Sequence, residues 1–158
     1  MSLGPALRVR LCAVDDVVGL RQLVLRPHQT LEEVRWETDG QANAEHFCAY
    51  DEAGAVVCVA SLWREPPPWQ PSAPNAWRLR GMATAPEWRE KGAGSAVLTA
   101  VVAHVAGGGG GLLWCNARLG AVKFYERAGM ATRGEQWEEP IIGPHVAMYM
   151  MVPALSLR

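Results

Sequence analysis

The sequence lacks most of the features that assign a protein to a class by composition alone. Its cysteines show neither the C-x-x-C spacing nor the clustered histidines of a zinc site; they are Cys12, Cys48, Cys58 and Cys115. We therefore expect ordinary reduced thiols in a cytoplasmic protein, with no disulfide and no metal ion.

Long apolar runs and an excess of charge are missing as well. No segment reaches the roughly 20 apolar residues of a membrane span, and the N-terminal residues lack the pattern of a signal peptide. The 15 basic and 16 acidic residues leave a net charge of -1, so there is no global positive field of the kind that attracts nucleic acid. We expect neither a membrane nor nucleic acid as a partner.

What the sequence contains is an ordinary globular composition, with 49% apolar and 20% charged residues. A chain of 158 residues can bury a substantial core, so residues 1–158 are expected to form a single domain. Alternation predicts strands at 7–13, 46–50, 55–63, 77–84, 112–116, 130–138 and 145–152, and helical periodicity predicts helices at about 16–26, 94–106 and 121–128, with a short one near 31–36. This order indicates a mixed α/β domain.

Local signals predict where these elements begin and end. Asp15 or Asp16 is expected to cap the first helix, and Asn116 to cap the helix near 121–128, which Gly129 would end in a left-handed conformation. The sequence D-E-A-G at 51–54 predicts a tight hairpin turn between two strands. The prolines of 66–75 lack amide donors and predict a stiff surface loop.

The segment P-E-W-R-E-K-G-A-G-S-A-V, at 86–97, carries the strongest chemical signal. Helix N-termini present unpaired amides and a partial positive charge, and glycines let the backbone approach a ligand closely. Arg89 and Lys91 add positive charge just before the two glycines. Phosphate is the expected ligand, although a G-x-G sequence also occurs in a simple tight turn between a strand and a helix.

Two common nucleotide motifs do not fit this segment. A phosphate-binding loop of the P-loop type needs a lysine followed by serine or threonine after its last glycine, whereas Lys91 precedes Gly92. The dinucleotide motif G-x-G-x-x-G/A is matched only in degraded form, and it belongs after the first strand of a βαβ unit. The phosphate group is therefore expected to belong to a different ligand.

Three stretches together resemble the GNAT superfamily of acyl-CoA-dependent N-acetyltransferases. The sequence R-E-K-G-A-G at 89–94 is similar to the R/Q-x-x-G-x-G/A pyrophosphate loop of that family, and R-L-R-G-M-A-T-A-P precedes it as the central strand does there. The later stretch N-A-R-L-G-A-V-K-F-Y-E-R-A-G-M is similar to the family's strand-to-helix motif. The resemblance implies a central mixed, mostly antiparallel sheet flanked by helices, and acetyl-CoA as co-substrate.

The resemblance also implies which residues hold the cofactor. The backbone of Met82, Ala83 and Thr84 would pair with the pantetheine arm, and the amide of Met82 would polarise the thioester carbonyl. The pyrophosphate would be wrapped by the loop residues Arg89, Glu90, Lys91, Gly92, Ala93, Gly94 and Ser95. The alternative for this loop is a solvated basic turn.

Tyr125 matches the family tyrosine that protonates the departing thiolate. A phenol titrates near pH 10 and is still protonated at neutral pH, so it can donate. A buried core aromatic is the other interpretation, and the two are compatible. Asn116 matches an asparagine that contacts the cofactor arm, and Phe124 packs either against pantetheine or, as we favour, in the core.

The acceptor amine must lose a proton, and the family has no single motif for the base. His145 is the first candidate, because histidine titrates near neutral pH; a histidine bonded to backbone at a strand end is the equal alternative. Glu138 and Glu139 come next, and Glu45 is a distant candidate. His28, His46 and His104 are expected to be surface or structural groups.

Two short strings, L-R-Q-L-V-L-R-P at 20–27 and G-P-H-V-A-M at 143–148, resemble the ElaA-like branch of the family. That narrower resemblance implies a loop over the acceptor carrying Arg26, Trp36 and Asp39, and we group Glu138 with them as substrate-binding. A plain surface loop is the alternative.

The sequence therefore favours an enzyme that transfers an acetyl group from acetyl-CoA to a primary amine by direct attack in a ternary complex. No residue pattern suggests an activated nucleophile. A CoA-binding sensor without turnover and a nucleotide-phosphate binder are the alternatives. The acceptor is expected to be a small-molecule amine, with a weak preference for a cationic one from the acidic groups near its site. A homodimer is a further expectation, because many relatives pair through edge strands.

Overall fold

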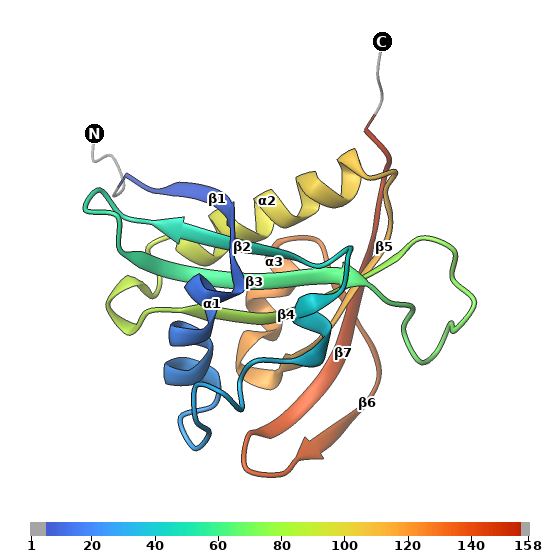
Figure 1. The fold of residues 1–158 in the computed structure, drawn as a ribbon. Helices are drawn as coiled ribbons and strands as arrows, with labels where there is room; N and C mark the ends of the chain where they lie inside the picture. The colour runs from blue at the N-terminus through green and yellow to red at the C-terminus, as the bar shows by residue number, and fades with distance from the viewer. Residues whose placement is uncertain (1–5, 156–158) are drawn as a thin grey trace. The chain divides into compact units, whose positions relative to one another are not determined.

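The structure, a computed structural model, describes residues 6–155 and has the mixed α/β fold expected from the sequence (Figure 1). Its strands are β1 Arg8–Cys12, β2 Glu45–Tyr50, β3 Val56–Arg64, β4 Ala76–Thr84, β5 Gly111–Arg118, β6 Ala131–Glu139 and β7 Gly143–Val152. Its α-helices are α1 Val14–Leu20, α2 Ala93–Gly107 and α3 Val122–Arg127. Hydrogen bonding joins the strands in the order β1-β2-β3-β4-β5-β7-β6. Of these neighbours β4 and β5 are parallel, and four other pairs are antiparallel.

The chain divides into two compact units. Unit 1 comprises Met1–Trp63 and Gly81–Val101, and unit 2 comprises Arg64–Arg80 and Val102–Arg158. β4 and α2 each run from one unit into the other. The expectation of one domain stays a prediction. None of the helices in the described part of the chain has the length and apolar character of a membrane span.

Unit 1 is built on the antiparallel strands β1, β2 and β3, with α1 and the first half of α2 on opposite faces (Figure 1). Val17 of α1 packs with Cys48, Val59 and Ala83 in a buried cluster. The predicted hairpin between β2 and β3 is confirmed: the Asp51 carboxylate accepts the amides of Ala53 and Ala55, each at 2.9 Å.

Two local predictions in unit 1 are wrong. Ala13, not Asp15 or Asp16, is the N-cap of α1, and both aspartates lie in the first turn. Their carboxylates still favour the positive end of the helix dipole, which explains the misplaced signal. The short helix expected near 31–36 is a turn followed by a 3₁₀ helix at Glu37–Gly40.

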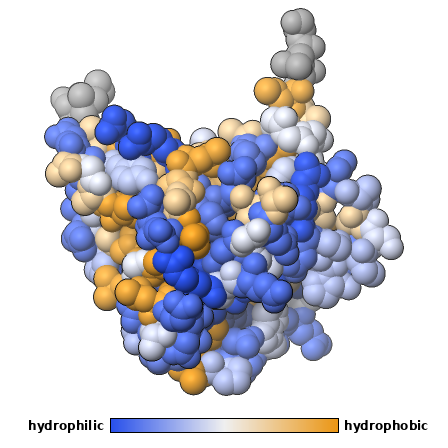
Figure 2. Space-filling model, in the orientation of Figure 1, coloured by the Kyte–Doolittle hydropathy of each residue, from blue (hydrophilic) through white to orange (hydrophobic). Residues whose placement is uncertain are grey.

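The surface of unit 1 is apolar in places. Leu23 and Leu31 are 58% and 54% exposed. Figure 2 shows hydrophobic residues mainly over the part of that face that carries β1 and α1.

Unit 2 contains β5, β7 and β6 in that order, each antiparallel to its neighbour, with α3 beside β6 (Figure 1). Gly129 follows the C-cap of α3 at φ +103°, as predicted, and the amide of Met130 reaches back to the carbonyl of Tyr125 at 3.1 Å. Asn116 does not cap this helix. It lies inside β5, and Ala121 is the N-cap.

The proline-rich segment before β4 is a loop, as expected, and one of its residues is anchored. Trp69 packs edge-on against Trp114 and Tyr149, with ring centroids 5.7 and 6.3 Å apart. The indole nitrogen of Trp114 donates to the Glu65 carbonyl at 2.8 Å. These contacts fix the loop to one face of the β5–β7 pair.

Candidate functional site

The loop between β4 and α2 has the backbone of an anion-binding turn. Glu90 and Gly92 take the left-handed conformation, with φ of 60° and 86°, immediately before α2 begins at Ala93. A Cβ on Gly92 would meet nothing within 4 Å, so this glycine is needed for its conformation and not for space. The first-turn amides of a long helix have no carbonyl within that helix to bond, so they are directed at the space before it.

The charged side chains of this loop are exposed. Arg89, Glu90 and Lys91 are all open to solvent, and Lys91 Nζ lies 5.6 Å from the ring centroid of Trp88. Ala93 is buried and anchors the start of the helix. The loop thus combines oriented amides with two long cationic side chains, an arrangement that suits a phosphate group.

Met82, Ala83 and Thr84, at the end of the strand that leads into this loop, have buried or half-buried side chains. Met82 Sδ and Thr84 Oγ1 lie 3.9 and 3.3 Å from Cys58 Sγ, and Ala83 is buried on the other face. Burial raises the pKa of Cys58 to about 11, so this thiol is neutral at physiological pH.

The ladder between β4 and β5 is short. It pairs Ala76 with Leu112, Trp77 with Leu113 and Arg78 with Trp114, and it ends there although β4 continues to Thr84. Backbone groups that leave a ladder need another partner, either protein, water or ligand.

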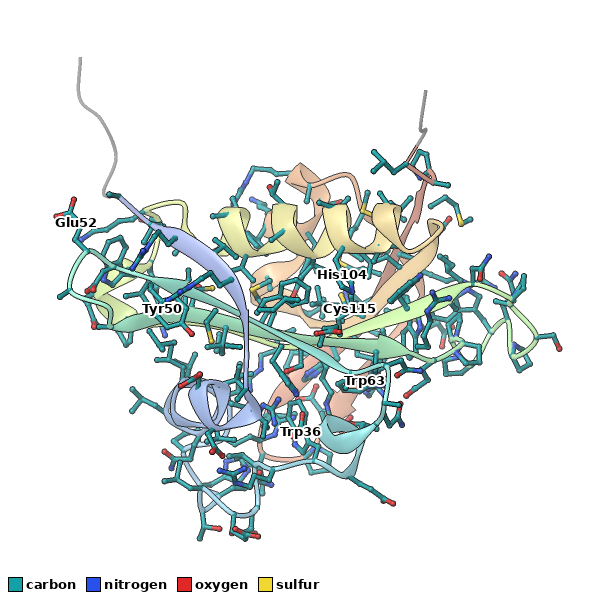
Figure 3. All side chains as sticks on the ribbon, turned by 45° about the horizontal axis from the view of Figure 1, so that its top comes forward. Trp36, Tyr50, Glu52, Trp63, His104 and Cys115 are labelled. Carbon is teal, nitrogen blue, oxygen red and sulfur yellow. The ribbon has the colours of Figure 1, made fainter. Side chains whose placement is uncertain are left out.

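Gly81 adds an irregularity within β4, at φ +72°. A Cβ there would lie 3.2 Å from the Trp36 ring and 3.4 Å from Arg21 Nε. Both the backbone conformation and the close approach of these side chains therefore require glycine. Figure 3 shows Trp36 on the α1 side of the strands.

Arg21 is the centre of a buried polar network that sequence reasoning missed. Its side chain is fully buried and forms a bidentate pair with Asp39, at 2.8 and 3.0 Å. It also donates to the Val34 carbonyl at 2.7 Å and to Ser61 Oγ at 2.9 Å, and its guanidinium lies 3.6 Å from the Trp36 ring centroid. The available signal was an arginine four residues after Val17, in register with the apolar face of α1, at the start of the π-helical turn Arg21–Leu25.

His46 completes this network. Its Nε2 lies 3.4 Å from the Asp39 carbonyl, which can only accept, so Nε2 is the donor. Nδ1 then accepts from Ser61 Oγ at 2.7 Å. The expectation of a structural histidine is consistent with these contacts.

The residues proposed for the acceptor loop, Arg26, Trp36 and Asp39, all lie in unit 1 but differ in burial and in hydrogen-bond partners. Trp36 is half-buried against Arg21, and Arg26 Nη1 donates to the neighbouring Leu25 carbonyl at 3.1 Å. Burial acts to raise the pKa of Asp39, but hydrogen bonds from Arg21 and the Trp36 amide outweigh it and lower that pKa. Asp39 is thus held as a carboxylate by protein groups.

In unit 2, His145 is buried at the start of β7. Its Nδ1 lies 2.8 Å from the Gly143 carbonyl, and its ring stacks on Trp137 with centroids 5.8 Å apart. The carbonyl can only accept, so Nδ1 carries the proton and Nε2 of the neutral ring keeps a lone pair. Both sequence interpretations are therefore compatible: the ring is bonded to backbone, and its other nitrogen can act as a base.

The strand register separates Glu138 from His145. Trp137 is the direct partner of His145, whereas Glu138 faces Pro144. Because successive side chains alternate between faces, Glu138 lies on the opposite face of the hairpin from His145. The Glu139 carboxylate accepts the Trp137 indole N–H at 2.9 Å.

Tyr125 is buried in α3 and meets Phe124 edge-on, with ring centroids 5.0 Å apart. Phe124 is half-buried, whereas Asn116 is exposed on β5 and pairs with Ala147. Burial raises the pKa of Cys115, the residue before Asn116, to about 12. The tyrosine ring has the core environment foreseen for it.

Comparison with known proteins assigns the family. The acetyltransferase (GNAT) family matches residues 15–130. The chain belongs to this family. It is also 33% identical, over 143 residues, to the uncharacterized N-acetyltransferase YitI of Bacillus subtilis, covering 90% of this chain and 95% of that protein.

Solved structures share the GNAT fold at low sequence identity. The ribosomal-protein-S18-alanine N-acetyltransferase of Escherichia coli superposes with a TM-score of 0.75 at 13% identity, covering 96% of this chain and 97% of that one. Escherichia coli ElaA gives 0.73 at 14% identity, covering 92% and 98%. At such identity the likeness shows the fold alone, and the ElaA-like branch stays a prediction.

Membership in the GNAT family makes the protein an acetyltransferase, and acetyl-CoA is the donor that this family uses. The observed β4–α2 loop fits a diphosphate by its left-handed backbone, its helix N-terminus and its exposed cations. Among residues 6–155, no cluster of histidine, cysteine, aspartate and glutamate side chains is arranged to hold a metal ion.

Proposed function

We propose that this GNAT protein transfers an acetyl group from acetyl-CoA to a primary amine of a small molecule, by direct attack of the amine in a ternary complex. The observation that carries the proposal is the conformation of the β4–α2 loop, where Glu90 and Gly92 turn the chain into the N-terminus of α2. The amides of Gly92, Ala93, Gly94 and Ser95 bind the diphosphate, and Arg89 and Lys91 neutralise its charge.

The strand β4 orients the donor. Its ladder with β5 ends at Arg78, so the backbone of Met82, Ala83 and Thr84 is proposed to pair with the pantetheine arm. A main-chain amide there, that of Met82, polarises the thioester carbonyl without any reorganisation, because the strand holds it in place. Asn116 is proposed to contact the same arm.

Two proton transfers complete the reaction. Tyr125 is proposed to donate its phenolic proton to the departing thiolate. His145 is proposed to take the proton from the amine through Nε2, because its Nδ1–H is held by the Gly143 carbonyl at 2.8 Å. Stacking on Trp137 fixes the plane of the ring.

The test is release of the CoA thiol over a panel of primary amines, comparing wild type with Tyr125→Phe. Loss of a general acid should lower kcat roughly 10²-fold or more while acetyl-CoA binding, measured by calorimetry, stays within about twofold. His145→Gln should lower kcat/KM, because a side-chain amide cannot take the proton from the amine.

Tyr50→Phe is the matched control, because it removes a phenolic hydroxyl from β2 and should leave kcat unchanged. Equal rates for wild type and Tyr125→Phe would remove Tyr125 from the mechanism. Acetyl-CoA binding without thiol release from any amine would favour the alternative, a CoA-binding sensor.

A further inference from the structure

One face of the β5–β7–β6 sheet in unit 2 carries aligned side chains, and the proposed reaction gives a role to only some of them. Direct cross-strand partners share a face of a sheet, and residues two apart along a strand do so too. On this face Asn116 of β5, Ala147 of β7 and Arg133 of β6 form one row across the strands. Ala147 is only 7% exposed, whereas Asn116 and Arg133 are exposed.

Larger side chains border this row on both sides. The row before it contains Trp114 and Tyr149, with Trp69 packed over both. The row after it contains Arg118 of β5 and His145, with the Trp137 ring stacked on the histidine. We call the middle row the Ala147 row: a small residue at its centre, polar side chains at its two ends, and aromatic rings on either side.

The charged side chains near the Ala147 row differ in whether they have a partner of opposite charge. The Glu65 carboxylate is bound by Arg78 at 3.0 Å, and Glu139 accepts from Trp137. The Arg133 guanidinium carbon lies over the Trp69 ring, 5.3 Å from its centroid, and within residues 6–155 Arg133 forms no ion pair. This cation–π contact positions the guanidinium while its N–H groups stay available to an acceptor.

We propose that the acceptor of this enzyme is an amine that also carries a carboxylate, which Arg133 binds, while the amine lies toward Asn116 and His145. This inference rests on the proposed function and reverses the weak preference for a cationic acceptor drawn from the sequence. Adjacent strands lie about 4.8 Å apart, so Asn116 and Arg133 are about 10 Å apart at their Cα atoms. A rigid, planar amino acid matches that span and the aromatic rows beside it.

The test uses 4-(aminomethyl)benzoate and 4-(aminomethyl)benzamide, which have the same shape and similar amines but differ in charge. Wild type should acetylate the benzoate with a kcat/KM at least about tenfold higher, since charge-assisted bidentate pairing is lost in the amide. Arg133→Gln should reduce this ratio to within about twofold, because it lowers kcat/KM for the benzoate far more than for the benzamide. Arg127→Gln, an exposed arginine of α3, should keep the wild-type ratio.

Equal rates for the two compounds in wild type, or an equal loss for both in Arg133→Gln, would overturn the proposal. A second measurement is independent of turnover: binding of 4-methylbenzoate and 4-methylbenzamide to the CoA-loaded protein by calorimetry. The benzoate should bind at least about fivefold tighter to wild type and no tighter to Arg133→Gln. No preference in wild type overturns the inference, whereas a preference without thiol release from either amine counts against the proposed function alone.

Discussion

At the scale of single residues, the main finding is the use of a buried arginine. Arg21 lies where the helical pattern calls for an apolar residue, and it is compensated by Asp39, Ser61 and the Val34 carbonyl. A buried ion pair adds little net stability over apolar residues of the same volume. Removing only one partner is costly, because the other charge stays buried without compensation. This pair therefore links residues 34–39 to the helical turn Arg21–Leu25 that follows α1.

Arg21→Met should lower the free energy of unfolding by about 3–5 kcal/mol, because the Asp39 carboxylate is left without its partner. Urea denaturation measures this change. The double variant Arg21→Met with Asp39→Leu should recover part of the loss, since it removes both charges.

The exposed pair Arg35–Asp15 is the control for this prediction, because its side chains are 40% and 77% exposed. Arg35→Met should cost under about 1 kcal/mol. A similar loss for both arginines would mean that the buried network has no special role in stability.

At the scale of elements, backbone conformation decides where glycine is required. Gly129 ends α3 at φ +103°, and a Cβ added there would have the Met150 methyl as its nearest neighbour at 3.7 Å, so space is available and conformation is the constraint. Gly19 lies inside α1 with nothing within 4 Å, and here glycine only weakens the helix.

Gly129→Ala should destabilise the protein by about 1–2 kcal/mol, because an L-residue is strained in the left-handed region. Gly19→Ala should stabilise it by up to about 1 kcal/mol, since alanine favours the helix. The effects on the free energy of unfolding are measured from the denaturant midpoints of the two variants, provided that the dependence of that free energy on denaturant concentration is unchanged. Shifts of the same sign would contradict the assignment of either glycine.

At the scale of the whole molecule, binding of acetyl-CoA should be measurable as an increase in the stability of the folded protein. A ligand that binds only the folded protein stabilises it by about 2.7 kcal/mol at 100 times its Kd. For a chain of 158 residues this corresponds to a rise in Tm of roughly 5–10 °C.

Acetyl-CoA should produce such a rise in a thermal melt, and ATP at the same concentration should not, because the loop lacks the lysine arrangement of a P-loop. Protection by ATP or NAD alone would instead support the nucleotide-phosphate binder. The glycine turn at 92–94 would then have to be reassigned.

Much of the fold follows from local patterns. Alternation and helical periodicity located the strands and the helices α2 and α3, because these signals need only the side chains of the segment itself. The caps predicted at Asp15, Asp16 and Asn116 were wrong because the helices begin after alanines, Ala13 and Ala121, with no side-chain cap hydrogen bond. A capping rule that looks for a polar side chain cannot find such a start.

The sequence by itself determined the family, through the motifs at 89–94 and 116–130, and with it the expectation of acetyl-CoA. Such motifs are short, and their backbone requirements are met by adjacent residues. Only the tertiary structure decided that Arg21 meets Asp39 and Ser61, that Glu138 lies away from His145, and that the Arg133 guanidinium lies over the Trp69 ring. These pairings depend on strand register and loop packing between segments far apart in the chain, which no local pattern encodes.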